Sequence, residues 1–314
     1  MVPKVSVIIA AYNVERFISK CVDSVLAQTF SDYEIILIDD GSTDQTPEIC
    51  DRLAKKSKKI TVIHQPNQGL SEVRNRGIRN STGEYIALID GDDYVSVDFL
   101  EKLMDAITKN KAEIAGCGFK TVPVRRLYPA KSGVFSGEQA TIDLLTEQET
   151  YQIVSWNKIY KRELFKGIEF PVRKRNEDCL TTYKLLGCAK KVAYVDELLY
   201  YYSQRDDSIM GTIELKERLD MKLLAATEAK EYFKGNRKLE QAAEICELLA
   251  YFSYIDNICA GRLNLSLKRY FDFIKERKDY LLANPYINNK LETYIKMVTF
   301  KNGGLYKAFR KIKN

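Results

Sequence analysis

The 314-residue chain lacks the sequence features that mark several large protein classes. No run approaches the roughly 18 consecutive apolar residues that a membrane-spanning helix needs. The first residues, MVPKVSVIIAAYNVE, show neither a basic leader nor a cleavage site, so we expect an unprocessed cytoplasmic protein. The cysteines are odd in number, seven, and contain no C-x-x-C pair, which argues against a zinc knuckle, a redox motif or a disulfide framework. We expect them to be reduced, buried packing residues.

Phosphate-binding glycine motifs are also missing. No G-x-G-x-x-G and no G-x-x-x-x-G-K-[ST] occurs, which excludes a Rossmann dinucleotide turn and a P-loop. The net charge of +6 is unevenly distributed, because residues 1–115 hold 14 Lys and Arg against 18 Asp and Glu, whereas the remainder holds 35 against 25. The excess of basic residues after residue 115 is compatible with binding to nucleic acid, to a membrane surface or to a phosphorylated ligand. No zinc-finger, RNP or helix-turn-helix pattern accompanies it, so we expect no nucleic-acid partner.

Apolar runs alternate with segments of helical period in the first third of the chain. The runs have the length and composition of buried strands, and they cover residues 5–10, 33–39, 60–64, 84–90 and 113–119. Between the first two, Phe17, Cys21 and Val25 recur at helical spacing and form one apolar stripe. Strands that alternate with helices predict an α/β domain with a mostly parallel sheet.

The rest of the chain is organised differently. After the fifth run, glycine and proline interrupt the pattern, and only a helix from about Glu177 to Gly187 and an aromatic strand at 198–205 stand out. Beyond that strand the period is helical to the end of the chain. We therefore predict two domains, an α/β domain over residues 1–210 and a helical accessory domain over residues 211–314.

Polar residues follow each of the first four predicted strands. In an open parallel sheet, ligands bind outside the carboxyl ends of the strands, so these residues are expected to share one crevice. After the fourth strand, Asp90 and Asp92 flank Gly91 and supply the hard oxygen ligands that suit Mg²⁺ or Mn²⁺, which can bridge a diphosphate. Asp-Gly-Asp-Asp is also an ordinary turn sequence. Its position after a buried strand, beside the Asp39-Asp40 pair, favours the functional interpretation.

Three segments with these motifs carry a family resemblance. The sequences IIAAYNVERFISKCVDSVLAQTFSDYEIILIDDGSTDQT, NQGLSEVRNRGI and TGEYIALIDGDD occur in this order. Together they resemble the nucleotide-sugar half of family 2 glycosyltransferases with the GT-A fold, especially bacterial enzymes that build wall polymers, capsules and protein glycans. The resemblance covers about residues 4–210. It departs mildly from the family pattern at Ala10, where many relatives have proline.

The resemblance implies a UDP-sugar donor site. Its residues would be Ala10 and Tyr12 beside the base, Asp40 on the uracil N3-H, Asn67 with Arg74 or Arg76 in the nucleotide pocket, and Asp90 with Asp92 as the DxD metal site. A carboxylate can distinguish uracil, which presents a donor at N3, from cytosine, which presents an acceptor there. The alternative for Asp40 is a turn or a helix-capping aspartate.

The resemblance also implies residues on the acceptor side. In the family, the second residue of a Glu-Asp pair acts as the base, which points to Asp178 with Glu177 beside it. The alternative is that both carboxylates only favour a helix N-terminus. The single tryptophan, Trp156, offers a flat face to a sugar ring, although a lone tryptophan is more often a core residue. Arg205 follows the aromatic strand, where a guanidinium can meet the diphosphate in bidentate fashion.

The segment after Arg205 and the sole histidine bear on the metal shell. The resemblance implies that Asp206 or Asp207 completes this shell. Some relatives use a downstream histidine as a ligand, but His64, the only histidine here, belongs to the third predicted strand. We interpret His64 as structural.

The expected activity is metal-dependent, inverting and non-processive transfer of a hexosyl or N-acetylhexosaminyl group from a UDP-sugar. The acceptor would be a hydroxyl on a glycan, a glycoprotein or a lipid-linked saccharide. Processive relatives usually carry membrane spans and a Q-x-x-R-W motif, and neither is found here. A phosphatase of the haloacid dehalogenase type would need a hydroxylic residue where Tyr94 stands. A non-catalytic UDP-sugar-binding subunit of another transferase is the second alternative, which the presence of Asp178 disfavours.

The last residues form a distinct segment. KNGGLYKAFRKIKN, residues 301–314, contains five basic residues and no acidic one, and Leu305, Ala308 and Phe309 fall at helical spacing. This pattern predicts a short basic amphipathic helix. Such a helix can lie on an anionic surface, here the inner face of the cell membrane, close to a lipid-linked acceptor. Alternatively, the apolar face of this helix packs on the accessory domain, either of the same chain or of the second copy in a homodimer.

Overall fold

The structure is a computed structural model that falls into two compact units. One comprises residues 1–141 with 149–212, and the other residues 142–148 with 213–314. The structure describes residues 2–130, 132–146, 153–204, 214–300 and 303–313. The predicted domain boundary near residue 210 therefore lies outside the described residues. None of the helices in these ranges is both long enough and apolar enough to span a bilayer.

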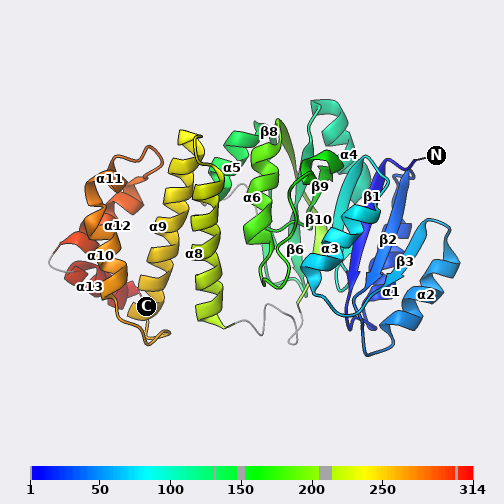
Figure 1. Cartoon of the computed structure of the whole chain (residues 1–314), viewed down its shortest axis with the longest axis horizontal. Coiled ribbons are helices and arrows are strands. Elements are labelled where there is room, and N and C mark those ends of the chain that lie inside the picture. Colours follow the sequence, from blue (N-terminus) through cyan, green and yellow to red (C-terminus); the bar gives the residue numbers. More distant parts are fainter. Residues whose placement is uncertain (1, 131, 147–152, 205–213, 301–302, 314) are drawn as a thin grey trace. The chain divides into compact units, whose positions relative to one another are not determined.

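The strands of the first unit join in one sheet (Figure 1) with the order β3-β2-β1-β4-β9-β6-β10-β5, and β7 and β8 pair with β6 and β10. Their bounds are β1 (Val5–Ala11), β2 (Tyr33–Asp39), β3 (Ile60–His64), β4 (Tyr85–Asp90), β5 (Tyr94–Val95), β6 (Ile114–Val122), β7 (Leu127–Tyr128), β8 (Gly133–Ser136), β9 (Lys158–Lys161) and β10 (Lys191–Ser203). The five strands that periodicity predicts in the first third of the chain all form.

Strands β1 to β4 make the parallel half of the sheet. Strand β1 lies between β2 and β4, and β3 pairs with β2, all in parallel. Strands β1, β2 and β4 are buried along nearly their whole length, as expected where helices cover both faces of a parallel sheet, whereas the edge strand β3 is buried only at Ile60. The helices that follow the strands are α1 (Ile18–Leu26), α2 (Thr46–Lys56), α3 (Leu70–Asn80) and α4 (Phe99–Asn110).

The other half of the sheet is mixed. Strand β9, which the sequence did not predict, runs antiparallel between β4 and β6. Strand β10 is parallel to β6 and begins at Lys191, earlier than the predicted aromatic strand, with register shifts between Val195 and Leu198 and between Leu198 and Tyr200. The remaining helices in this part of the chain are α5 (Gly137–Leu145), the 3-10 helix η1 (Arg162–Phe165) and α6 (Asp178–Cys188), and α6 is the helix predicted near residue 177.

The second unit is helical, as predicted. Its helices are α8 (Leu215–Tyr232), α9 (Arg237–Cys259), α10 (Lys268–Glu276), α11 (Lys278–Leu282), α12 (Asn289–Thr299) and α13 (Gly304–Lys313). The predicted C-terminal helix packs part of its surface, because Tyr306 is fully buried and its hydroxyl donates to Asp256 of α9 at 2.6 Å. Leu305, in contrast, keeps 47% of its surface exposed within the chain.

The cysteines follow the sequence expectation only in part. All seven are free thiols, and Cys21, Cys50 and Cys117 are buried. Cys188 is exposed at the end of α6, so the expectation of burial is wrong there. Cys188 is the last residue of α6, a helix whose residues are partly buried and partly exposed. Helical periodicity alone did not show whether Cys188 faces the core or the solvent.

Candidate active site

The ends of β1, β2 and β4 bring the predicted motifs to one edge of the sheet. Ala11 pairs with Asp39 of β2, and Ala10 pairs with Asp90 of β4. The chain turns tightly after β4, where the amide of Gly91 donates to the carbonyl oxygen of Ala10 at 2.8 Å. A Cβ atom at Gly91 would lie only 2.5 Å from that oxygen, so this approach requires glycine.

A buried arginine joins three carboxylates at this edge. Arg74, on α3, has a side chain that is 2% exposed. Its Nη1 donates to Glu177 Oε1 at 2.5 Å and to Asp178 Oδ1 at 2.8 Å, and its Nη2 donates to Asp90 Oδ1 at 3.0 Å. The guanidinium therefore connects the end of β4 to the start of α6 and brings the predicted base close to the predicted metal site.

The charges in this cluster depend on one another. Burial alone would lower the pKa of Arg74, but Asp178, Asp90 and Glu177 outweigh it and raise that pKa above its ordinary value. The arginine is therefore charged at every physiological pH. Burial raises the pKa of Glu177, although Arg74 acts in the opposite direction. A buried charge is tolerated only when it is paired and hydrogen-bonded, and Arg74 satisfies this condition through its carboxylate partners.

The last aspartate of the Asp-Gly-Asp-Asp sequence has an inward position that the sequence did not indicate. Asp93 is 1% exposed and accepts hydrogen bonds from the hydroxyl of Tyr200 at 2.8 Å and from the amide of Ser203 at 2.7 Å. The Tyr200 hydroxyl in turn accepts a hydrogen bond from the amide of Asp90 at 3.2 Å. Asp93 and Tyr200 thus fix the turn that carries Asp90 and Asp92, and Asp92 is half-buried.

Asp40 holds the loop that follows β3. Its carboxylate is 2% exposed and accepts from Gln65 Nε2 at 2.7 Å, from the amide of Gln68 at 2.9 Å and from the amide of Gly69 at 2.8 Å. Arg76 Nη1 donates to the other end of the Gln65 amide group, Oε1, at 3.0 Å. Asp40 and Arg76, both predicted donor-site residues, therefore act on the same loop.

The other predicted residues lie in different surroundings. Tyr12 is 48% exposed just after β1, and Ala10 is half-buried at the end of that strand. Asn67 is exposed in the loop that Asp40 holds. Arg205, together with the two aspartates after it, lies outside the described residues.

Trp156 belongs to an aromatic cluster. Its ring is 5% exposed and stacks on Tyr200 and Tyr202, with centroid distances of 4.2 and 5.6 Å. The ring of Phe119 meets it edge-on at 4.6 Å. The indole is therefore in contact with three other aromatic rings, which agrees with the core alternative for this residue.

His64 bridges two carboxylates beyond the cluster. Its Nδ1 lies 2.9 Å from Asp39 Oδ2 and its Nε2 lies 3.1 Å from Asp51 Oδ1. The hydrogen bond with Asp39 raises the pKa of His64 above its ordinary value. The histidine therefore ties the end of β3 to β2 and α2, in agreement with a structural role.

The carboxylates after β4 suit a metal ion that shares its ligands with a substrate. Among the described residues, no group of three or more His, Cys, Asp or Glu side chains could hold a metal. Asp90 and Asp92 provide two carboxylates, and Mg²⁺ is commonly held by one or two carboxylates together with substrate phosphates. The donor set therefore fits a divalent cation that also binds a diphosphate.

Comparisons with known proteins agree with this geometry. The model of the family "Glycosyl transferase family 2" matches residues 6–168, more than half of the chain. The chain belongs to this family. It is 39% identical over 253 residues to EpsJ of Bacillus subtilis, an uncharacterized glycosyltransferase, and the match covers 78% of this chain and 73% of EpsJ. The protein is therefore a glycosyltransferase.

Solved structures share the fold. The crystal structure of S. aureus TarS residues 1–349 in complex with UDP-GlcNAc has a TM-score of 0.74 at 22% identity and covers 99% of this chain and 91% of that chain. A mannosyltransferase from Pyrobaculum calidifontis, solved with GDP-Man and Mn²⁺, has a TM-score of 0.60 at 17% identity. The match covers 96% of this chain and 87% of the mannosyltransferase chain. The fold is thus the predicted GT-A α/β domain followed by a helical region.

Proposed function

We propose that this glycosyltransferase moves a hexosyl or N-acetylhexosaminyl group from a UDP-sugar to an acceptor hydroxyl, with inversion and without processive elongation. The observation that carries this proposal is the Arg74 cluster, in which one guanidinium bonds to both Asp90 and Asp178. An inverting displacement needs a base on the acceptor hydroxyl and charge stabilisation for the departing diphosphate. The cluster places residues suited to both tasks within reach of a single side chain.

In this proposal Asp178 is the base. The hydrogen bond from Arg74 ends on Oδ1, so we assign proton acceptance to Oδ2. Asp178 lies in the first turn of α6, and this position and the hydrogen bond from Arg74 both limit the movement of its side chain. A fixed carboxylate takes the acceptor proton as the hydroxyl oxygen attacks the anomeric carbon, and the bond to the diphosphate breaks on the opposite side of the sugar.

Asp90 and Asp92 would hold Mn²⁺ or Mg²⁺. When bound, the ion supplies positive charge that stabilises the departing UDP. The role of this chain is to keep the two carboxylates in place. Arg74 bonds to the carboxylate of Asp90, and Tyr200 with Asp93 holds the turn that carries both aspartates. The Mn²⁺ in the mannosyltransferase neighbour is consistent with this assignment.

The donor base would lie at the ends of β1 and β2. We assign it to Ala10, Tyr12 and Asp40, with Asn67 and Arg76 contributing through the loop after β3. We also propose that residues 1–210 form the donor domain and residues 211–314 an accessory domain. The acceptor would be a glycan, a glycoprotein or a lipid-linked saccharide, and Glu177 and Trp156 would support the acceptor side from within the fold.

Release of UDP tests this function. Purified protein with Mn²⁺ is incubated with UDP-glucose, UDP-galactose, UDP-GlcNAc and UDP-GalNAc, and free UDP is quantified. We expect one donor to be hydrolysed faster than the others. A protein that binds these donors in calorimetry but releases UDP from none would instead be the non-catalytic subunit of another transferase.

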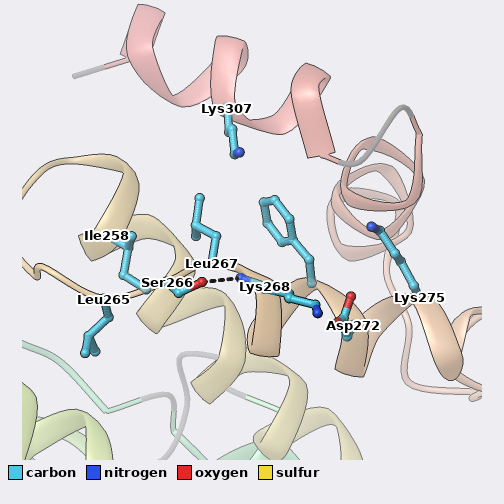
Figure 2. Close-up of a pocket in the computed structure, with 9 residues that line it drawn as sticks. Ile258, Leu265, Ser266, Leu267, Lys268, Asp272, Lys275 and Lys307 are labelled. Carbon is cyan, nitrogen blue, oxygen red and sulfur yellow. Dashed lines mark hydrogen bonds between the residues drawn. The ribbon is translucent and has the colours of Figure 1, made fainter.

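A basic cavity in the helical unit supports a contact with the inner membrane surface. The cavity has a volume of about 510 Å³ and is lined by residues of α9, α10, α13 and the segment before α10 (Figure 2). Lys268, Lys275 and Lys307 line it together with one acidic residue, Asp272, and with apolar side chains that include Phe271, and Lys307 Nζ lies 5.6 Å from the Phe271 ring centroid. Clustered lysines beside apolar surface suit an interface with anionic lipid.

Vesicle co-sedimentation tests the membrane proposal. We expect the protein to bind vesicles with phosphatidylglycerol and to lose most of this binding when Lys268 and Lys307 are both replaced by glutamine. Lys234→Gln, on another exposed part of the same unit, is the control. Binding that ignores lipid charge would contradict the proposal. A dimer in gel filtration would favour the alternative in which the unit pairs with a second copy.

A further inference from the structure

Lys158 is a buried lysine that the mechanism above does not use. It is the first residue of β9 and is 0% exposed. Its Nζ donates to the carbonyl oxygen of Val154 at 2.6 Å and to Asn157 Oδ1 at 2.7 Å. Lysine is almost never fully buried unless its ammonium group is paired. These contacts indicate that the side chain holds the preceding turn from the inside.

The turn over residues 153–157 is fixed at further points. Asn157 Nδ2 donates to the carbonyl oxygen of Cys117 on β6 at 2.6 Å. The hydroxyl of Tyr160 donates to the carbonyl oxygen of Ser155 at 3.0 Å. Side chains from β9 thus bind the backbone of the turn, and Lys158 contacts both Val154 near its beginning and Asn157 at its end.

Trp156 belongs to this turn and connects it to the strand-end aspartates. The indole stacks on Tyr200 at 4.2 Å. The hydroxyl of that tyrosine donates to Asp93 and accepts from the amide of Asp90. A series of contacts, joined through the backbone of residues 154–157, therefore runs from the buried Nζ of Lys158 to the turn that follows β4.

We propose that Lys158 is a positioning residue, whose ammonium group fixes the 153–157 turn and, through Trp156 and Tyr200, the position of Asp90 at the donor diphosphate. This inference rests on the function proposed for the same site. Burial lowers the pKa of Lys158 to about 7, and the nearby negative charge of Asp178 opposes this effect. The counter-charge that favours the protonated form of Lys158 is therefore Asp178, the proposed base itself.

The test is the substitution Lys158→Met, which preserves length and removes charge and donors. The matched control is Lys161→Met on the same strand, where the side chain is 30% exposed and pairs with Glu163 at 3.1 Å. Because Trp156 is the only tryptophan, intrinsic fluorescence reports on the turn without any assay of turnover. We expect Lys158→Met to shift the emission to longer wavelength and to weaken the near-ultraviolet circular dichroism, and Lys161→Met to change neither.

Catalysis provides the second readout. We expect Lys158→Met to lower kcat by roughly tenfold and to raise the half-saturating Mn²⁺ concentration by a similar factor, while KM for the UDP-sugar at saturating metal changes by less than about twofold. Tyr200→Phe removes the hydroxyl that bonds to Asp93 and Asp90 but retains the aromatic ring that stacks on Trp156. It should reproduce the kinetic change with wild-type tryptophan emission.

These readouts separate the inference from the proposed function. Wild-type protein without transferase activity would refute the function, and the fluorescence comparison would still test the effect of Lys158 on the turn. Wild-type emission in a folded Lys158→Met variant would overturn the inference. If Lys158→Met does not fold, Tyr200→Phe decides, because wild-type kcat and metal requirement in that variant would show that the series does not reach the site.

Discussion

Arg74 and Asp178 are 104 positions apart in the sequence, yet Nη1 of the arginine lies 2.8 Å from Oδ1 of the aspartate. The arginine is on α3, and the aspartate begins α6. The same guanidinium reaches Asp90 at the end of β4. A planar group with several fixed donors can bridge carboxylates in this way, whereas an ammonium group cannot match the geometry. Arg74 is therefore the structural link between the proposed metal site and the proposed base.

Replacement of this link should damage both stability and rate. Arg74→Lys keeps the charge but cannot serve all three carboxylates, and a buried ion pair that loses a partner costs about 3–5 kcal/mol. We expect a lower free energy of unfolding in urea and a loss of transfer of about 10²-fold. Arg79→Lys, on the exposed side of α3, is the control. Wild-type rate and stability in Arg74→Lys would contradict the role described here.

The metal assignment predicts a specific requirement. Excess EDTA should abolish transfer, and Mn²⁺ or Mg²⁺ should restore it, because Asp90 and Asp92 are the proposed ligands. Asp92→Ala should remain inactive at all metal concentrations, whereas Asp105→Ala, exposed on α4, should behave as wild type. Undiminished transfer in EDTA would refute the metal site.

Asp40→Asn tests recognition of the base. We expect UDP to lose part of its advantage over CDP in a competition assay, because an amide can present a donor where the carboxylate only accepts. The carboxylate also binds the loop amides of Gln68 and Gly69, so some loss of affinity for both nucleotides is expected. The ratio of the two affinities is the decisive quantity. An unchanged ratio would show that Asp40 holds the loop but does not select the base.

His64 should make stability depend on pH. Its pKa is raised by Asp39, so the stabilisation is fully present below the unfolded value of about 6.5 and is lost as pH rises through the higher folded value. As the only histidine, it gives one imidazole titration in proton NMR. We expect a midpoint above 6.5 and a lower midpoint in Asp51→Asn. A midpoint at or below the ordinary value would show that the bridge does not form in solution.

Local pattern explains which parts of the fold the sequence could predict. The residues of β1 to β4 are continuous apolar runs bounded by polar turns, so their type and order follow from periodicity. Strand β9 has four residues and begins with Lys158, a residue that only tertiary packing makes compatible with burial. Its antiparallel insertion between β4 and β6 depends on contacts far apart in the chain.

The candidate site, like the fold, could be predicted from the sequence only in part. The motif resemblance identified Asp90, Asp178 and Arg74 as candidates. It did not indicate that the arginine bonds to both aspartates, because these partners come from separate elements. Asp93 carried no signal that separated it from Asp92, since only its distance to Tyr200 and its burial show its inward position.

The role of Asp178 as the base is tested most directly by a comparison of donor binding with transfer in Asp178→Asn. The substitution preserves size and removes the proposed base, so UDP-sugar affinity in calorimetry should stay within about twofold of wild type. Transfer measured in single-turnover experiments should fall by about 10²-fold or more. Wild-type transfer, or a loss of rate fully explained by a loss of donor affinity, would contradict the assignment of Asp178 as the base.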